Sequence, residues 1–182
     1  MTLTKWMAAA AALAITAGAV PASGKVAVDQ ASSPALARGS TFAWAPTPAI
    51  GIGLPDPTIA NDITADRLRT ITESTLAAKG YREVASPADA DLLVSYTIVM
   101  LPETDAELSS FGGGCRAFCS RPGNVRLDTH RYTRGTMMLD LTERSTGRLV
   151  WRATSDKRVT AKDASQEKLA AVLREMTKSL PQ

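Results

Sequence analysis

Hydrophobic residues recur with helical spacing in two segments of the chain. The first starts near Asn61–Asp62, either of which can cap a helix, and stops at Gly80. The second starts at Asp163, with Gln166 as a capping-box partner, and ends at Pro181. The apolar positions are Ile63, Leu68, Ile71 and Leu76 in the first segment, and Leu169, Val172, Leu173, Met176 and Leu180 in the second. This pattern predicts two amphipathic helices, each with one apolar stripe for packing on a sheet.

Alternating hydrophobic and polar residues predict the strands of that sheet. Short strands are expected at Thr41–Trp44 and Tyr81–Val84, and a longer one in DLLVSYTIVML, residues 91–101. The longer strand has Leu92, Val94, Tyr96, Ile98 and Met100 on one face, with Ser95 and Thr97 opposite. The expected fold is a two-layer α+β domain, with a mostly antiparallel sheet and the two helices on one face.

A hairpin is predicted around the turn Ser145-Thr146-Gly147. If these three residues form the loop, Arg144 faces Arg148, Leu141 faces Trp151, and Asp140 faces Arg152 as a cross-strand charge pair. The register predicts a buried face made of Met137, Leu139, Leu141, Leu149 and Trp151.

Two stretches show no sustained period. Residues 23–40 are rich in Ser, Ala and Gly and are expected to form a flexible leader. Residues 102–134 are polar and are expected to form one long loop, which is unusual within a compact domain. The predicted organisation is therefore a single domain at 41–181 with a loop at about 102–134.

The N-terminal segment MTLTKWMAAAAALAITAGAVPASG resembles a secretory signal peptide. It has one lysine, an apolar run to about Val20, and small residues around a cleavage position after Ala22. The run is shorter than the roughly 20 apolar residues of a membrane span. An uncleaved anchor is the alternative. No cysteine follows the run, so lipidation is not expected, and residues 1–22 are taken as a signal that exports the chain to the periplasm or cell envelope.

The balance of basic and acidic residues argues against a nucleic-acid partner. The chain has 21 Lys and Arg against 18 Asp and Glu, and cleavage after Ala22 would remove one lysine. This near balance does not provide the concentrated basic face that phosphate neutralisation requires, so a nucleic-acid partner is not expected. No integral membrane segment is expected after cleavage.

The two cysteines lie in SSFGGGCRAFCSRPG, residues 109–123. Their spacing matches neither the haem-attachment motif nor a Cys-x-x-Cys redox motif, and a zinc site could draw only on Cys115, Cys119, Asp128 and His130. An oxidising compartment and an even cysteine count favour a Cys115–Cys119 disulfide, which would bend the chain there. No metal or other cofactor is expected.

Several basic residues surround this pair. Solvated arginines are the simplest interpretation, and contact with anionic lipid, glycolipid or an acidic envelope protein is the functional alternative. The candidate contact residues are Arg116, Arg121, Arg126, His130 and Arg131, with Arg134 adjoining them.

Motifs for catalysis are absent from the sequence. There is one histidine, no Gly-x-Ser-x-Gly, and the triple glycine is not followed by Gly-Lys-Ser/Thr. No catalytic residue is therefore proposed. A hydrolase built on two carboxylates stays open, because their distance in space cannot be read from a sequence.

Three stretches carry a resemblance to a known family. These are AAKGY (77–81), ADLLVSY (90–96) and the pattern G-T-x-x-x-D-L-x-x-x-x-T-G-x-L-V-W-R (135–152). Over about residues 41–181 the chain resembles the bacterial envelope family called domain of unknown function 4136. The resemblance implies a two-layer α+β domain, often lipid-anchored in Gram-negative envelopes, with no established activity. Here the lipidation cysteine is missing and the cysteine pair is an addition.

These observations favour an exported envelope protein that works by binding or assembly, without catalysis. An envelope-polymer hydrolase and a carrier of small hydrophobic ligands are the alternatives. They differ in structure, because an enzyme needs a deep pocket with convergent polar groups and a carrier needs a cavity between helices and sheet.

Overall fold

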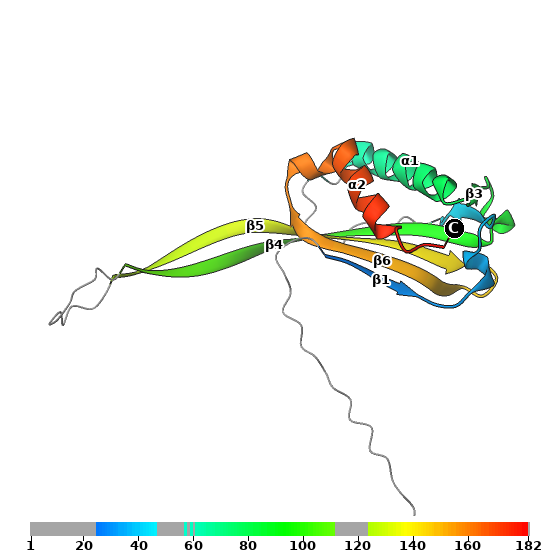
Figure 1. Ribbon diagram of the computed structural model, residues 1–182. Helices are drawn as coiled ribbons and strands as arrows, with labels where there is room; N and C mark the ends of the chain where they lie inside the picture. The colour runs from blue at the N-terminus through cyan, green and yellow to red at the C-terminus, as the bar shows by residue number, and fades with distance from the viewer. Residues whose placement is uncertain (1–24, 47–56, 58, 60, 112–123, 182) are drawn as a thin grey trace, which may run out of the picture.

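Six strands form one sheet, and both helices pack on the same face of it, in the computed structural model of the chain (Figure 1). The structure describes residues 25–46, 57, 59, 61–111 and 124–181. The strands are β1 (Lys25–Gln30), β2 (Thr41–Trp44), β3 (Arg82–Glu83), β4 (Leu92–Phe111), β5 (Asn124–Glu143) and β6 (Arg148–Val159). The helices are α1 (Asp62–Ala78) and α2 (Gln166–Met176), with short 3-10 turns η1 (Pro34–Leu36), η2 (Pro87–Asp89) and η3 (Ala161–Ala164).

The strand order is β1-β6-β5-β4-β2-β3. Pairing is antiparallel from β1 to β4, and β2 pairs in parallel with both β3 and β4. The predicted fold class, a two-layer α+β arrangement with helices on one face, is confirmed. We call the face that carries the helices the helix-side face and the other the open face.

Helix α1 begins where the sequence predicts. The Asn61 side chain accepts a hydrogen bond from the Thr64 backbone N at 3.0 Å, and Gly80 follows the helix with φ +94°, the left-handed conformation that glycine adopts most easily. Leu68, Ile71 and Leu76 are buried, as expected. Ile63 is not: its exposed fraction is 62%, because Thr64 takes the buried position at the start of the helix.

Helix α2 begins later than predicted. Asp163 lies in η3, where its carboxylate accepts hydrogen bonds from the backbone N (2.8 Å) and hydroxyl (2.9 Å) of Thr160. Ser165 caps α2 instead, since its hydroxyl accepts from the Lys168 backbone N. The helix then buries Leu173 and Met176 against the sheet.

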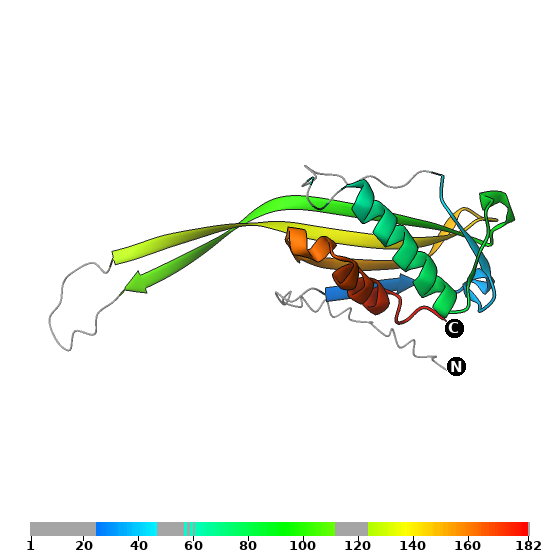
Figure 2. The ribbon, with the colours of Figure 1, turned by 90° about the horizontal axis from the view of Figure 1, so that it is seen from above.

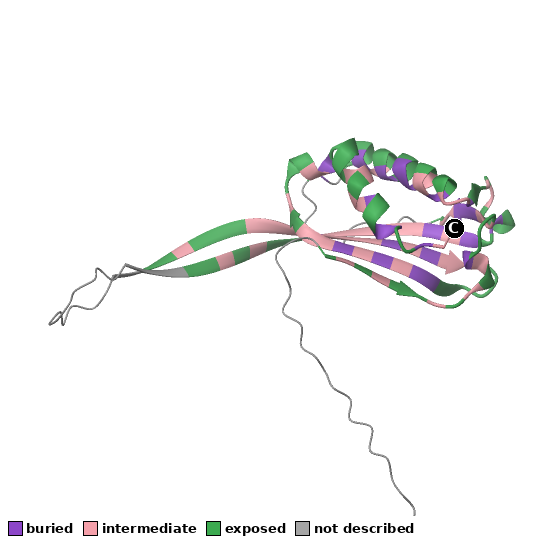
Figure 3. Ribbon diagram, in the orientation of Figure 1, coloured by how far each residue is buried: buried purple, intermediate pink, exposed green. Residues whose placement is uncertain are grey.

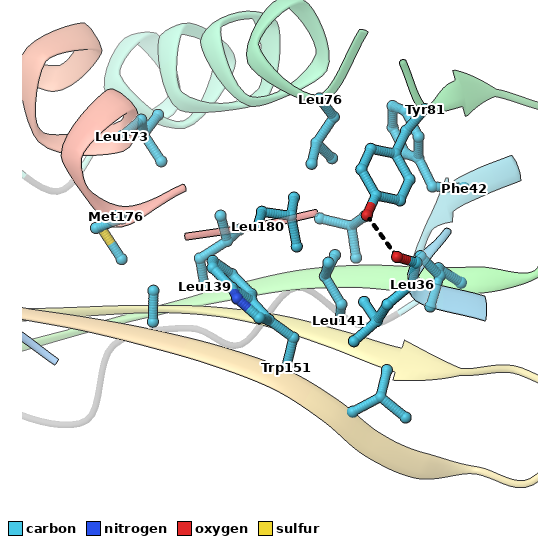
Figure 4. Close-up of a cluster of buried hydrophobic side chains, with 14 of the residues drawn as sticks. Leu36, Phe42, Leu76, Tyr81, Leu139, Leu141, Trp151, Leu173, Met176 and Leu180 are labelled. Carbon is cyan, nitrogen blue, oxygen red and sulfur yellow. Dashed lines mark hydrogen bonds between the residues drawn. The ribbon is translucent and has the colours of Figure 1, made fainter. Parts of the chain in front are cut away.

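The core lies between the two helices and the helix-side face of the sheet (Figure 4). Tyr81 is buried within it, and so is Trp151, which confirms the burial predicted for Trp151. The Tyr81 hydroxyl donates to the carbonyl oxygens of Leu36 (3.3 Å) and Pro181 (3.2 Å). Tyr81 therefore connects η1 and the C-terminal residues to the core.

The β5–β6 hairpin keeps the predicted register only away from its turn. Asp140 lies opposite Arg152 and Leu141 opposite Trp151, but a bulge follows, so Glu143 rather than Arg144 opposes Arg148. The bulge buries Val150 beside Trp151 and leaves Leu149 with an exposed fraction of 41%. The expected burial of Leu149 is therefore wrong.

The expected flexible leader is also wrong over its described part. Residues 25–30 form β1, which pairs with β6 from Lys25 opposite Asp156 to Gln30 opposite Trp151. Leu36, in η1, is buried in the core. The alternation in KVAVDQ (25–30) is short, and four of its six residues are exposed, so the strand resembles a polar linker in sequence.

The expected long loop at 102–134 is a second correction. β4 and β5 pair continuously from Leu92 opposite Glu143 to Phe111 opposite Asn124, whereas β6 ends at Val159, opposite Thr133. Residues 103–111 and 124–132 therefore project from the body as a two-stranded ribbon, which we call the arm (Figures 1 and 2). Residues 112–123 lie outside the described part of the chain.

Candidate functional site

The arm has two faces of different chemistry. The register places Thr104 opposite Arg131 and Ala106 opposite Thr129, on the face that continues the helix-side face of the sheet. On the other face Glu103 lies opposite Tyr132, Asp105 opposite His130, and Glu107 opposite Asp128. The four described carboxylates of the arm are all on the open face. None of the arm side chains that the structure describes is buried (Figure 3).

Charged side chains on the open face fix the base of the arm to β6. Arg134 pairs with Glu103 at 2.9 Å and with Asp156 at 3.3 Å. Thr136 donates a hydrogen bond to the second Asp156 oxygen at 2.7 Å. A hydrogen bond to Tyr132, together with the nearby Asp156 and Glu103 carboxylates, raises the pKa of Arg134 above its ordinary value.

The same network includes the first residues of the arm. Arg158 of β6 pairs with Asp105, and its guanidinium carbon lies 3.9 Å from the centre of the Tyr132 ring. The Tyr132 hydroxyl donates to the Glu103 carboxylate. We call Glu103, Asp105, Tyr132, Arg134, Asp156 and Arg158 the base network. It links three strands and directs the arm away from the body.

The residues proposed for an anionic contact do not form one surface. Arg126 and His130 lie on the open face of the arm, and Arg126 pairs with Asp128 at 2.9 Å. Arg131 lies on the helix-side face. Arg116 and Arg121 fall outside the described residues, as do Cys115 and Cys119 with their expected disulfide. The described part of the arm contains four carboxylates and two guanidinium groups.

A small apolar cavity lies in the body near the base of the arm. Its volume is about 60 Å³. Helices, η3 and sheet all contribute to its walls, and the ion pair of Lys157 and Asp163, at 2.6 Å, borders it. The lining includes Ile59, Ile98, Met100, Gly135, Leu169 and Val172.

A second hollow, of about 280 Å³, lies between α1 and the start of β4. The rings of Trp44 and Tyr96 meet edge to face at 6.1 Å, and the Arg69 guanidinium lies 5.4 Å from the Trp44 ring. Glu73 accepts hydrogen bonds from Trp44 Nε1 (2.8 Å) and Arg69 Nε (2.9 Å). The polar groups around Trp44 are therefore paired with one another.

Titratable groups near this hollow are shifted in directions that follow from their surroundings. Burial raises the pKa of Tyr96, and the nearby Asp66 carboxylate adds to the effect. Burial and the neighbouring Glu73 carboxylate raise the pKa of Glu83. Glu73 and Glu83 are therefore neighbouring carboxylates, and Glu73 already accepts hydrogen bonds from Trp44 and Arg69.

The described residues show neither a metal-binding cluster nor a membrane-spanning helix. No group of three or more His, Cys, Asp or Glu side chains there is arranged to hold a metal ion. None of the helices in the same part of the chain combines the length and apolarity needed to cross a membrane.

Comparison with known proteins identifies the family. The family model described as a domain of unknown function (DUF4136) matches residues 26–182. This chain belongs to the DUF4136 family. The match confirms the resemblance. It also extends the resemblance from residues 41–181 to nearly all of β1. No curated protein is significantly similar to this DUF4136 chain.

A solved structure of a family member shares the fold, and two further solved structures show a weaker likeness. A DUF4136 family protein from Bacteroides thetaiotaomicron is 14% identical, with a TM-score of 0.51, covering 86% of this chain and 95% of that one. The PelC dodecamer from Paraburkholderia phytofirmans is 19% identical, with a TM-score of 0.47, covering 86% and 97%. A PDZ domain protein from Parabacteroides distasonis is 12% identical, with a TM-score of 0.49, covering 87% and 35%.

Sequence reasoning missed the base network of this DUF4136 protein. The signal was present as alternating charge: Glu103, Asp105 and Glu107 are two residues apart, as are Arg126, Asp128 and His130. A period of two in polar residues is typical of a strand with two solvated faces, but such a strand lacks the hydrophobic period from which strands are usually predicted.

Proposed function

We propose that this DUF4136 protein is exported to the periplasm or cell envelope and acts there by binding or assembly, without catalysis, through its arm. The observation that carries the proposal is the projection of a paired two-stranded ribbon beyond the last residue of β6. Residues 1–22, with the features of a signal peptide, support export.

The arm contributes nothing to the core of its own chain. All of its described side chains are exposed or half-exposed, and none belongs to either hydrophobic cluster. A two-stranded ribbon without packing partners is marginally stable in water. Its base is nevertheless fixed by ion pairs on three strands, so the arm is presented in a defined direction. A contact with another molecule would explain both features.

The two alternatives have less support in the described residues. A cavity of about 60 Å³ has the volume of roughly two water molecules, too small for a lipid chain. In the hollow beside Trp44, Glu73 is occupied by Trp44 and Arg69, and Asp66 is the one carboxylate among the described residues that line the hollow, so no pair of carboxylates converges there for hydrolysis.

A protein surface fits the described part of the arm better than an anionic lipid does. Four carboxylates there would oppose an anionic headgroup, and the two guanidinium groups lie on opposite faces. An anionic lipid or glycolipid contact by Arg116 and Arg121 is the second form of the proposal, with the disulfide of Cys115 and Cys119 as its expected support.

The experiment combines fractionation with site-specific crosslinking in cells. A photocrosslinking amino acid is placed at Ala106 on the arm, and at Ala27 of β1 as the matched body control. An arm-shortened variant, in which Asn-Gly replaces residues 104–131, keeps Glu103 opposite Tyr132 across a two-residue turn.

We expect envelope localisation for all variants and a discrete protein adduct from position 106 only. Recovery of the full chain in the cytoplasm would overturn the export proposal. Equal adducts from positions 27 and 106 would overturn the assignment of binding to the arm. Anionic vesicles that retain the full chain but not the arm-shortened variant would favour the lipid form.

A further inference from the structure

The two most exposed large hydrophobic side chains among those described are Ile63 on α1 and Leu127 on the arm, with exposed fractions of 62% and 60%. Each lies near an exposed charged residue, and the two charges are opposite. We propose that the helix-side face of the arm docks onto the outer face of α1 in a second copy of this chain. This inference rests on the proposed function, since it names the arm's partner.

The helix-side face of the arm is almost free of charge. It presents Thr104, Ala106, Leu127, Thr129 and Arg131. Arg131 is the single charged group on this face in the described part of the arm. Its guanidinium forms no ion pair or hydrogen bond with any residue that the structure describes. In the body the same face of the sheet is covered by α1 and α2, whereas along the arm no described helix covers it (Figure 1).

The outer face of α1 offers the complementary features. Ile63, Asp66 and Thr70 lie three and four residues apart, so they share one side of the helix. They border a shallow groove of about 310 Å³ together with Arg67 and Gln166. The Asp66 carboxylate accepts no hydrogen bond and forms no ion pair within the described residues.

The two surfaces match in character, with one exposed hydrophobic side chain and one charge unpaired within the described residues on each, although these two groups lie further apart on the arm than on the helix. Leu127 and Arg131 are roughly 13 Å apart along their strand. Ile63 and Asp66 are about 5 Å apart along the helix, and the long, flexible arginine side chain can span the difference. Contact would cover both hydrophobic side chains and pair both charges. It would also repeat, between copies, the packing of helix on sheet that forms the core of each body.

These surfaces cannot meet within one chain. Leu127 is six residues beyond Thr133, the last residue of β5 that pairs with β6, or roughly 20 Å further out. Figures 1 and 2 show the arm leading away from the body and from α1 in both views. A second copy of the chain carries both the arm surface and the complementary surface of α1. We therefore take a second copy as the partner of the arm. The carboxylate-rich open face would remain in solvent.

The test is a charge exchange followed by sedimentation velocity. The chain from residue 23 is measured between about 1 and 100 µM, as are Arg131→Asp, Asp66→Arg and the double variant. We expect the unmodified chain to self-associate. Each single reversal should weaken association at least tenfold, and the double variant should recover most of the loss because the ion pair is restored with opposite polarity.

Leucine substitutions provide the matched control. Leu127→Ser should weaken self-association, whereas Leu149→Ser, which removes an exposed leucine from the open face, should leave it unchanged. A monomeric unmodified chain at 100 µM, or a double variant that associates no better than the single variants, overturns the inference. If the chain is monomeric while position 106 still crosslinks another envelope protein, the proposed function stands and only the identity of the partner is wrong.

Discussion

Gly135 lies in β5, where the arm leaves the body and the chain has no room for a side chain. A Cβ atom built there would lie 2.7 and 2.9 Å from the two methyl carbons of Val159. We expect Gly135→Ala to lower the free energy of unfolding by about 1–3 kcal/mol, because two strands would have to separate locally. Denaturant unfolding measures the change. Adding Val159→Ala to the same chain should cost less than the sum of the two single substitutions, and strict additivity would contradict the steric explanation.

Glu83 should destabilise the protein at neutral pH. Its folded pKa is raised by burial and by the Glu73 carboxylate, so the fold favours the protonated form, and stability is lost as pH rises through the folded pKa. We expect Glu83→Gln to raise Tm by roughly 1–2 °C at pH 7, a small effect because the side chain is largely exposed. The gain should vanish below about pH 4, where the unfolded chain is also protonated.

Glu73→Gln is the contrasting variant. Glu73 accepts hydrogen bonds from Trp44 and Arg69, so its replacement should lower Tm at pH 7. A rise in both variants would mean that relief of the repulsion between Glu73 and Glu83 outweighs the hydrogen bonds that Glu73 accepts.

The base network holds the arm in a fixed orientation relative to the body, so the loss of one of its ion pairs should loosen the arm. Arg134 bridges Glu103 and Asp156, so Arg134→Gln removes one of the two links between the base of the arm and β6 and leaves that of Arg158. Hydrogen exchange of the backbone amides of residues 103–107 should become faster by about tenfold, while α1 amides stay unchanged. Lys178→Gln removes a surface ion pair on the far C-terminal segment and is the matched control. Unchanged exchange in the arm would show that the network does not fix it.

Elements with one buried face could be predicted from the sequence, and elements without one could not. The stripe of α1 and the alternation of Leu92 to Met100 reflect contact with the core, so their periods are visible. The described side chains of the arm bury neither face, and β1, at the sheet edge, half-buries only Val26 and Val28, so both resembled irregular chain. Whether an element could be predicted from the sequence therefore depended on its burial pattern and not on its length.

The exact start of a helix and the face on which a strand residue lies could not be predicted from residue spacing alone. Asp163 and Ser165 are both good caps, and which of them starts α2 depends on η3. For the candidate site, Arg126, His130 and Arg131 were predicted as one basic group, but the strand pairing puts Arg131 on the other face. Asp140 and Arg152 were predicted correctly, and two hydrogen bonds of 2.7 and 2.6 Å join them.

At the scale of the molecule, the body should fold with nearly unchanged stability when the arm is removed. No described arm residue belongs to the hydrophobic clusters, so we expect the variant with Asn-Gly in place of residues 104–131 to unfold cooperatively within about 3 °C of the full chain. Calorimetry measures both. A loss of more than about 10 °C would mean that the arm stabilises the body, and the arm could then no longer be treated as a surface reserved for a partner.

The placement of β1 has a consequence for the order in which the chain can fold. β1 is the first strand in sequence, yet it pairs only with β6, as Lys25 opposite Asp156 and Gln30 opposite Trp151 show. A chain that emerges from its N-terminus must therefore expose this segment until nearly all of it has appeared. Such distant pairing makes closure of the sheet slow. For the export that we propose, late pairing of β1 would lengthen the time during which the newly made chain can be threaded through a translocation channel.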